Sequence, residues 1–230
     1  MPLNPNEDTA TTRTALVVVA HPRPDSLTAH IAGLATQRLT AAGYHIDLLD
    51  LHAEGFDPRM TAADLPEWGN REKTYSPEVE SHMRRVLAAD IVVAVFPVYW
   101  VQVPAILKGW IDRVWNYGFA YGRSKPRLAG KRMLWLGLAG AADDDGVVDI
   151  MQQSLSMQLN DGIAYYCGLA ESSVGLLPGA EEKRQRVDAD GNLLLDEALT
   201  GTVRDAHYAA LEDRARHLVD DFLAGDRVPA

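Results

Sequence analysis

Short apolar runs alternate with longer amphipathic stretches along the chain. The runs are continuous enough to be typical of strands buried on both faces. We predict five strands, at residues 14–20, 44–49, 90–96, 133–138 and 172–177. Between and after the strands, apolar residues recur at helical spacing, which predicts helices over 27–43, from 77 onward, and over 103–117, 147–159 and 202–223.

Strands that alternate with helices predict a parallel sheet with right-handed crossovers. Five strands suit the doubly wound order 2-1-3-4-5, which reverses between the first and third strands. That reversal brings residues 21–28, 97–101 and 139–146 to one crevice at the carboxyl ends of the strands. We therefore expect an α/β fold with its ligand site in that crevice.

Three segments lie outside this alternation. Residues 52–75 form a polar excursion with two prolines, too long for a plain connector, and are expected to be a lid or an edge element. Residues 179–199 are expected to form a hairpin or loop that turns at 190–192. The polar residues 1–13 are expected to be a disordered tail, not a signal peptide, before a single domain at 14–225.

Composition narrows the possible partners. The 230 residues carry a formal net charge of −10, which argues against nucleic acid and anionic membrane surfaces as ligands. No apolar run approaches the length needed to cross a membrane. The single cysteine, Cys167, excludes an intramolecular disulfide and is expected to be a buried thiol, and metal-site spacing of Cys and His is absent. A cytoplasmic location is the expectation.

The first loop of the crevice, at residues 21–28, has no glycine-rich phosphate motif, which disfavours a nucleoside triphosphatase. Ser26 and Thr28 nevertheless place hydroxyls and amide groups at a helix N-terminus, where a phosphate is favoured. The alternative is that these residues only cap the helix and bind no phosphate.

The second loop follows Pro97, which we expect to end its strand, and precedes Pro104, which suits a first helical turn. Tyr99 and Trp100 would lie where open α/β sheets bind flat ligands, although ordinary core packing explains them equally well. In the following helix an apolar stripe indicates core packing, whereas Lys108, Asp112 and Arg113 are expected on a charged outer face.

Several sequence blocks resemble one enzyme family. They are residues 96–100 (FPVYW), 103–110 (VPAILKGW), 119–121 (FAY) and 56–58 (FDP). Together they closely resemble the NAD(P)H:quinone oxidoreductases of the DT-diaphorase type, and the resemblance runs from about residue 15 to 177. It implies a flavodoxin-like, doubly wound five-stranded sheet and a flavoenzyme, NAD(P)H dehydrogenase (quinone). Two electrons would pass from NAD(P)H to a quinone or similar planar acceptor by a ping-pong mechanism.

The resemblance also implies a site. FAD is expected, because the excursion at 52–75 is similar to that of the longer, FAD-binding members, and FMN is the alternative, because shorter relatives hold FMN on the same loops. The expected flavin contacts are His21, Ser26, Leu27, Thr28, Pro97, Val98, Tyr99, Trp100, Val101, Ala139 and Gly140. Trp100, Phe119 and Tyr121 are expected to contact the acceptor, in an active site shared across a homodimer.

The third loop departs from the family pattern. The family carries a tyrosine and a histidine after the fourth strand, and residues 139–146 offer no counterpart, so the catalytic acid and base stay unassigned. An alternative function is a flavin-bearing ancillary subunit of a potassium-efflux transporter. A one-electron carrier like flavodoxin is a weaker alternative, because residues 21–28 lack its phosphate loop.

Overall fold

The structure is a computed structural model that describes residues 12–141, 146–181, 185–187, 190–195 and 198–225. Five parallel strands form one sheet in the order β2-β1-β3-β4-β5, which confirms the predicted topology. The strands are β1 Thr14–Val19, β2 His45–Asp50, β3 Ile91–Pro97, β4 Arg132–Leu138 and β5 Glu171–Leu177.

The central strands are buried on both faces, as their apolar sequences predict. In β1, Leu16 and Val18 pack on one side of the sheet, while Ala15 and Val17 pack on the other. All seven residues of β3 are buried. Each face therefore needs its own layer of helices, because a bare sheet face of this composition would expose apolar surface to water.

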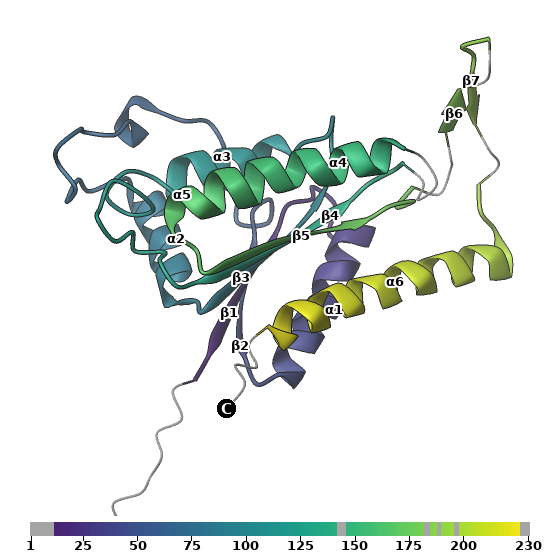
Figure 1. The fold of residues 1–230 in the computed structure, drawn as a ribbon, viewed down its shortest axis with the longest axis horizontal. Helices are drawn as coiled ribbons and strands as arrows, with labels where there is room; N and C mark the ends of the chain where they lie inside the picture. Colours follow the sequence, from purple (N-terminus) through teal and green to yellow (C-terminus); the bar gives the residue numbers. More distant parts are fainter. Residues whose placement is uncertain (1–11, 142–145, 182–184, 188–189, 196–197, 226–230) are drawn as a thin grey trace, which may run out of the picture.

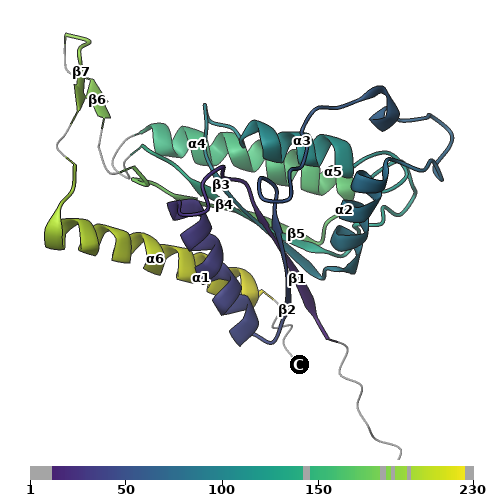
Figure 2. The ribbon, with the colours of Figure 1, turned by 180° about the vertical axis from the view of Figure 1, so that it is seen from behind.

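Helices cover the two faces in separate layers (Figures 1 and 2). On one side lie α1 and α6, whose apolar residues share a core with odd-numbered residues of β1 and β3. On the other side lie α2, α3, α4 and α5. The helices are α1 Leu27–Ala41, α2 Pro77–Ala88, α3 Ala105–Val114, α4 Val147–Ser156, α5 Tyr165–Cys167 and α6 Gly201–Ala224, with a 3₁₀ turn at Ala62–Asp64 and a π-helical segment at Met157–Ala164.

Two predicted helices have different ends. The helix expected over 103–117 is shorter, because Pro104 is its N-cap in an extended conformation rather than part of its first turn. The helix expected to end near 159 continues through the π-helical segment to Cys167 and ends at Gly168, which has a left-handed conformation. Asn160 and Gly162 lie inside the π segment, so these residues do not end the helix there.

The segment after β5 forms the predicted hairpin. Its strands β6 Gln185–Val187 and β7 Leu193–Leu195 pair antiparallel, and Gly191 at the turn has a φ of 83°. In Figure 1 the hairpin stands away from the sheet, above the N-terminal end of α6. The first ten residues of α6 are not buried, and its buried side chains are Leu211, Ala215, Val219 and Phe222.

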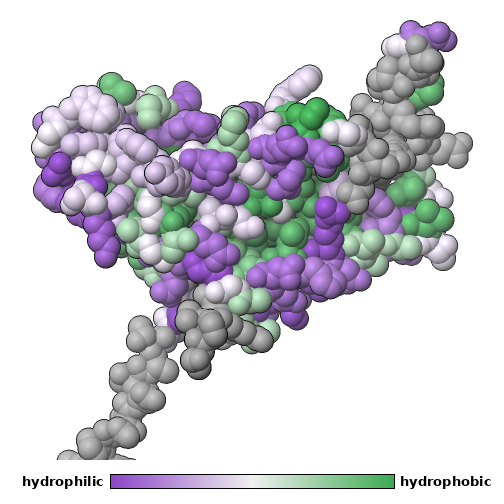
Figure 3. Space-filling model, viewed as in Figure 1, coloured by the Kyte–Doolittle hydropathy of each residue, from purple (hydrophilic) through white to green (hydrophobic). Residues whose placement is uncertain are grey.

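At the N-terminus, residues 1–11 of the predicted tail lie outside the described part of the chain. Arg13, also assigned to that tail, is fixed to the domain: its guanidinium donates to the Ala42 carbonyl (2.8 Å) and its own carbonyl accepts from His45 (2.8 Å). The hydrophobic surface visible between α4 and α6 in Figure 3 lies over the edge of the sheet and is flanked by hydrophilic side chains. Within the described ranges, no helix is long and apolar enough to cross a membrane.

Candidate functional site

An open groove of about 850 Å³ lies where the chain leaves the carboxyl ends of β1, β3 and β4. The three predicted loops converge on it, as the strand order requires. Eight of the expected flavin contacts line the groove: His21, Ser26, Leu27, Thr28, Pro97, Val98, Tyr99 and Gly140.

The first loop is ordered by its own polar contacts. Ser26 is the N-cap of α1, and its Oγ accepts a hydrogen bond from the Ala29 amide (3.2 Å). The amides of the first helical turn have no acceptor inside the helix, so those of Leu27 and Thr28 can serve an anionic ligand. A salt bridge from Arg23 to Asp25 (3.1 Å) lies beside them, and the hydrogen bond from Arg23 holds the pKa of Asp25 below its usual range.

The second loop forms a tight turn with exposed aromatic side chains. Tyr99 and Gln102 exchange two backbone hydrogen bonds of 3.0 Å, which closes a turn with Trp100 and Val101 at its tip. Both tip residues have positive φ, 51° and 62°, which is unfavourable for a β-branched residue such as Val101. Trp100 is 96% exposed and Tyr99 50% exposed. Core packing therefore does not explain either aromatic, and Trp100 and Val101 stand beside the groove without lining it.

Of the two contacts expected in the third loop, Gly140 lines the groove and Ala139 does not. Ala139 is fully buried, its amide donates to the Leu177 carbonyl (3.0 Å) and its carbonyl accepts from Ala180 (2.9 Å), so its contact with the flavin stays a prediction. Gly140 lines the groove, and a Cβ there would lie 2.6 Å from the Glu181 carboxylate. Residues 142–145, which include the three consecutive aspartates, lie outside the described part of the chain.

The far wall of the groove comes from residues that the sequence did not indicate. They are Ala180 and Glu181 after β5, and Arg204, Asp205, Tyr208, Ala209 and Glu212 on α6. Glu212 accepts a hydrogen bond from His30 of α1 (2.8 Å), which lowers the pKa of the Glu212 carboxyl group. The α6 wall could have been predicted from the topology, because a helix that follows the fifth strand returns to the sheet face that α1 already covers.

The predicted acceptor residues Phe119 and Tyr121 lie away from the groove. Phe119 is almost fully buried in the core, so little of its side chain is accessible to an acceptor. Its contact with the acceptor stays a prediction. Tyr121 borders a second cavity of about 330 Å³ between the excursion, α3 and α5. Tyr166 and Cys167 border the same cavity, and the Tyr121 and Tyr166 rings lie 5.4 Å apart.

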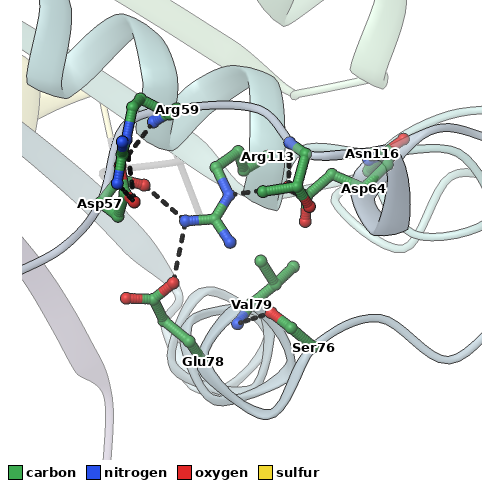
Figure 4. Close-up of polar contacts among 9 residues, drawn as sticks. Asp57, Arg59, Asp64, Ser76, Glu78, Val79, Arg113 and Asn116 are labelled. Carbon is green, nitrogen blue, oxygen red and sulfur yellow. Dashed lines mark hydrogen bonds and ion pairs between the residues drawn. The ribbon is translucent and has the colours of Figure 1, made fainter.

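A buried polar cluster fixes the excursion beside that second cavity (Figure 4). Arg113 of α3 donates to Asp64 (3.0 Å) and to Glu78 of α2 (2.8 Å), and Asn116 donates to the Asp64 carbonyl (2.5 Å). The expectation that Arg113 lies on an outer face is wrong: its side chain is buried because Asp64 and Glu78 supply the charge that burial requires. Lys108 and Asp112, in contrast, form an exposed ion pair (2.6 Å).

Comparison with known proteins identifies the family. A family model described as flavodoxin-like fold matches residues 13–193. The uncharacterized NAD(P)H oxidoreductase YcaK of Escherichia coli is 40% identical over 161 residues, covering 70% of this chain and 81% of that protein. This chain belongs to the NAD(P)H:quinone oxidoreductase family of flavodoxin-like proteins.

Other members of the family are similar over most of their length. Mouse ribosyldihydronicotinamide dehydrogenase [quinone] is 32% identical over 197 residues, which are 74% of this chain and 85% of that protein. Among solved structures, NAD(P)H:quinone oxidoreductase from Methanothermobacter marburgensis has the same fold, with a TM-score of 0.69, 21% identity, and coverage of 90% of this chain and 96% of that chain. A putative quinone reductase from Klebsiella pneumoniae gives a TM-score of 0.68 at 24% identity, covering 91% of this chain and 84% of that one.

Proposed function

We propose that this protein is a flavin-dependent NAD(P)H dehydrogenase that transfers two electrons to a quinone or a similar planar acceptor. The observation that carries this proposal is the groove, where a helix N-terminus, an exposed aromatic turn and a glycine meet at the carboxyl ends of three strands. The relatives named NAD(P)H oxidoreductase and ribosyldihydronicotinamide dehydrogenase [quinone] support the same reaction class.

The residues present fit a flavin. The amides of Leu27 and Thr28 and the helix dipole would hold the phosphates. Tyr99 and Trp100 would wall the flat ring, and backbone groups of residues 98–101 would hydrogen-bond its polar edge. Gly140 has no side chain, whereas a Cβ at this position would lie 2.6 Å from the Glu181 carboxylate. The glycine therefore leaves this part of the groove free for the flavin. When bound, the flavin supplies hydride transfer between the nicotinamide and the acceptor.

The chain itself has to position the two substrates in turn. We propose one shared pocket over the ring, so that NADP⁺ or NAD⁺ leaves before the acceptor enters, which is a ping-pong cycle. Without a tyrosine and histidine pair at the third loop, the remaining contribution of the chain is orientation and backbone hydrogen bonds, which can supply much of the rate enhancement.

We propose FAD as the flavin. The groove continues past the strand loops to Arg204 and Tyr208 of α6, which offers a wall for an adenosine portion that FMN lacks. FMN remains the alternative, since the general stress protein 14 of Treponema denticola, 19% identical with a TM-score of 0.57, was crystallised in complex with FMN.

We also propose that the working unit is a homodimer whose active site uses both chains. Tyr121 borders the second cavity and not the groove, so in this proposal it contacts an acceptor that is bound at the groove of a second chain. Large apolar side chains are exposed on the segments that contribute to this cavity, as expected of a surface that a partner covers. They are Met60, Leu65 and Trp68 of the excursion, Met157 of the π-helical segment, and Tyr165 and Tyr166 of α5.

The test is to release the flavin by heating, identify it, and determine its stoichiometry. We expect one FAD per chain, oxidation of NADPH or NADH with menadione, and parallel double-reciprocal lines when both substrates are varied. A colourless protein that takes up neither FAD nor FMN would contradict the proposal. Co-purification with a membrane transporter, without quinone turnover, would favour the ancillary-subunit alternative.

A further inference from the structure

A third cavity, of about 220 Å³, lies on the α2 side of the molecule, away from the groove. Its walls are the end of the excursion at residues 71–75, the middle of α2, and residues 117–119. Figures 1 and 2 place α2 and the excursion at one end of the molecule, and the hairpin and the start of α6 at the other. A ligand bound there would not compete with one in the groove.

The cavity is basic although the chain as a whole is acidic. Its lining includes four cations, Arg71, Lys73, Arg84 and Arg127, and two carboxylates, Glu72 and Glu80. Both carboxylates are already engaged: Glu72 pairs with Arg123 (2.6 Å) and Arg127 (3.6 Å), and Glu80 accepts from the Tyr75 amide (2.9 Å).

Two guanidinium groups are left for a ligand. In the described part of the chain, the side chains of Arg71 and Arg84 make no hydrogen bond or ion pair. The backbone of Arg71 is nevertheless fixed, because its carbonyl accepts from Arg123 (2.9 Å) and packs on Gly118. Gly118 has a φ of 81°, and a Cβ there would lie 2.3 Å from the Arg71 carbonyl oxygen. The Arg71 side chain therefore starts from an anchored position beside the cavity.

Part of the lining is apolar. Met83 and Phe119 are buried residues of the core, and Leu87 is an apolar side chain 44% exposed on α2. Guanidinium groups bind carboxylates with paired, charge-assisted hydrogen bonds, and an apolar wall favours a ring or short hydrocarbon body. The volume suits a single ring.

From these observations we propose that the cavity between Arg71, Arg84 and Leu87 binds a small aromatic carboxylate at a site separate from the groove. The carboxylate lies between the two free guanidinium groups, and the ring lies against Met83, Leu87 and Phe119. This site does not depend on the flavin chemistry, so its failure and the failure of the proposed function are distinguishable.

The probe is benzoate, titrated by calorimetry into the full-length protein loaded with flavin. We expect one site per chain, weaker binding at higher salt, and no binding of benzamide, which keeps the ring but lacks the charge. The double variant Arg71→Ala/Arg84→Ala should bind benzoate about tenfold more weakly or not at all, because each lost partner removes a charge-assisted bond. Its flavin content and quinone turnover should stay unchanged.

The matched control is Arg38→Ala/Arg59→Ala, which removes the same charge from exposed arginines that already pair with Asp220 and Asp57. It should keep the affinity for benzoate. Equal loss in both double variants would show a general charge effect and overturn the site. Absence of benzoate binding at millimolar concentration, or inorganic phosphate binding as tightly as benzoate, would also overturn the proposal.

Discussion

The guanidinium of Arg113 and the carboxylate of Asp64 form an ion pair 49 residues apart in sequence, with 3.0 Å between Nε and Oδ2. Both side chains are buried, at 5% and 0% exposed. The amide and hydroxyl of Thr61 donate to the same carboxylate oxygen at 2.8 and 2.9 Å. Through this pair the excursion is attached to α3 at the cavity that we assign to the dimer interface.

Asp64→Asn should destabilise the protein markedly. Burial alone would raise the pKa of Asp64, but hydrogen bonds from Thr61 and Arg113 hold it below its ordinary value, so the carboxylate is charged at neutral pH. The variant removes one of the two carboxylates that pair with the buried Arg113 and leaves Glu78, so the loss of a charge-assisted hydrogen bond should cost about 1.5–3 kcal/mol of unfolding free energy. Urea unfolding measures the loss. Asp220→Asn, which breaks the exposed pair with Arg38, is the control and should cost at most about 1 kcal/mol.

The same pair predicts the direction of acid sensitivity. A lowered native pKa stabilises the fold above the unfolded value of about 4, and this contribution is lost as pH falls further. Asp64→Asn should therefore lose less stability than the parent between about pH 4 and pH 2. Identical acid unfolding profiles would show that other carboxylates dominate.

The strands and the caps could be predicted from the sequence because their signals are local. The run from Ile91 to Phe96 is apolar at every position, and only a doubly covered strand buries such a run. Ser26 and Ser76 each stand immediately before a helical pattern, and both side chains accept a hydrogen bond from the third residue of their helix.

The remaining features depend on contacts between distant segments. Arg113 has the sequence signature of a solvated helix face, and only its contact with Asp64 explains its burial. Tyr208 and Glu212 reach the groove because α6 packs against α1, a pairing that no local pattern encodes. The position of Trp100 depends on a turn in which Trp100 and Val101 both have positive φ. Neither residue is a glycine, so the sequence does not indicate this backbone conformation.

Trp100→Ala should weaken flavin binding or quinone turnover while leaving the fold intact, because a side chain 96% exposed contributes little to the core. Loss of one aromatic stacking partner costs about 0.5–1.5 kcal/mol beyond its buried area. Flavin dissociation constants and steady-state kinetics give the readout. Trp68→Ala, at the other strongly exposed tryptophan, is the matched control and should keep flavin affinity. A lowered melting temperature with unchanged flavin affinity and kinetics would assign Trp100 to packing instead.

Tyr121→Ala should raise the KM for quinone with little change in flavin content, because Tyr121 borders the second cavity and not the groove. Sedimentation of the parent at micromolar concentration should show a dimer. A fully active species of 25.2 kDa would rule out the shared site. If the variant loses flavin but keeps normal turnover per bound flavin, Tyr121 belongs to the cofactor site.

Cys167 should resist alkylation in the folded protein. Its thiol is buried, and burial raises its pKa to about 11, so little thiolate forms at pH 8. Iodoacetamide at pH 8 should label native protein slowly and denatured protein with one equivalent. Because the thiol titrates later in the folded state than in the unfolded one, its contribution to stability should fall as pH rises from about 9 to 11. Rapid labelling of the native protein would show that the thiol is accessible.

Val101→Gly should separate the stability of the tight turn from its role in binding. Valine at a φ of 62° is strained by about 1–2 kcal/mol, and glycine relieves that strain at an entropic cost of about 0.5–1 kcal/mol. The variant should therefore be as stable as the parent or up to about 1.5 kcal/mol more stable. Flavin affinity should nevertheless fall, because a glycine at this position holds Trp100 less rigidly. Thermal unfolding and flavin titration are measured together, with Val203→Gly in helical backbone on α6 as a control that should lose stability. A variant less stable than the parent with unchanged flavin affinity would show that the turn serves the fold and not the ligand.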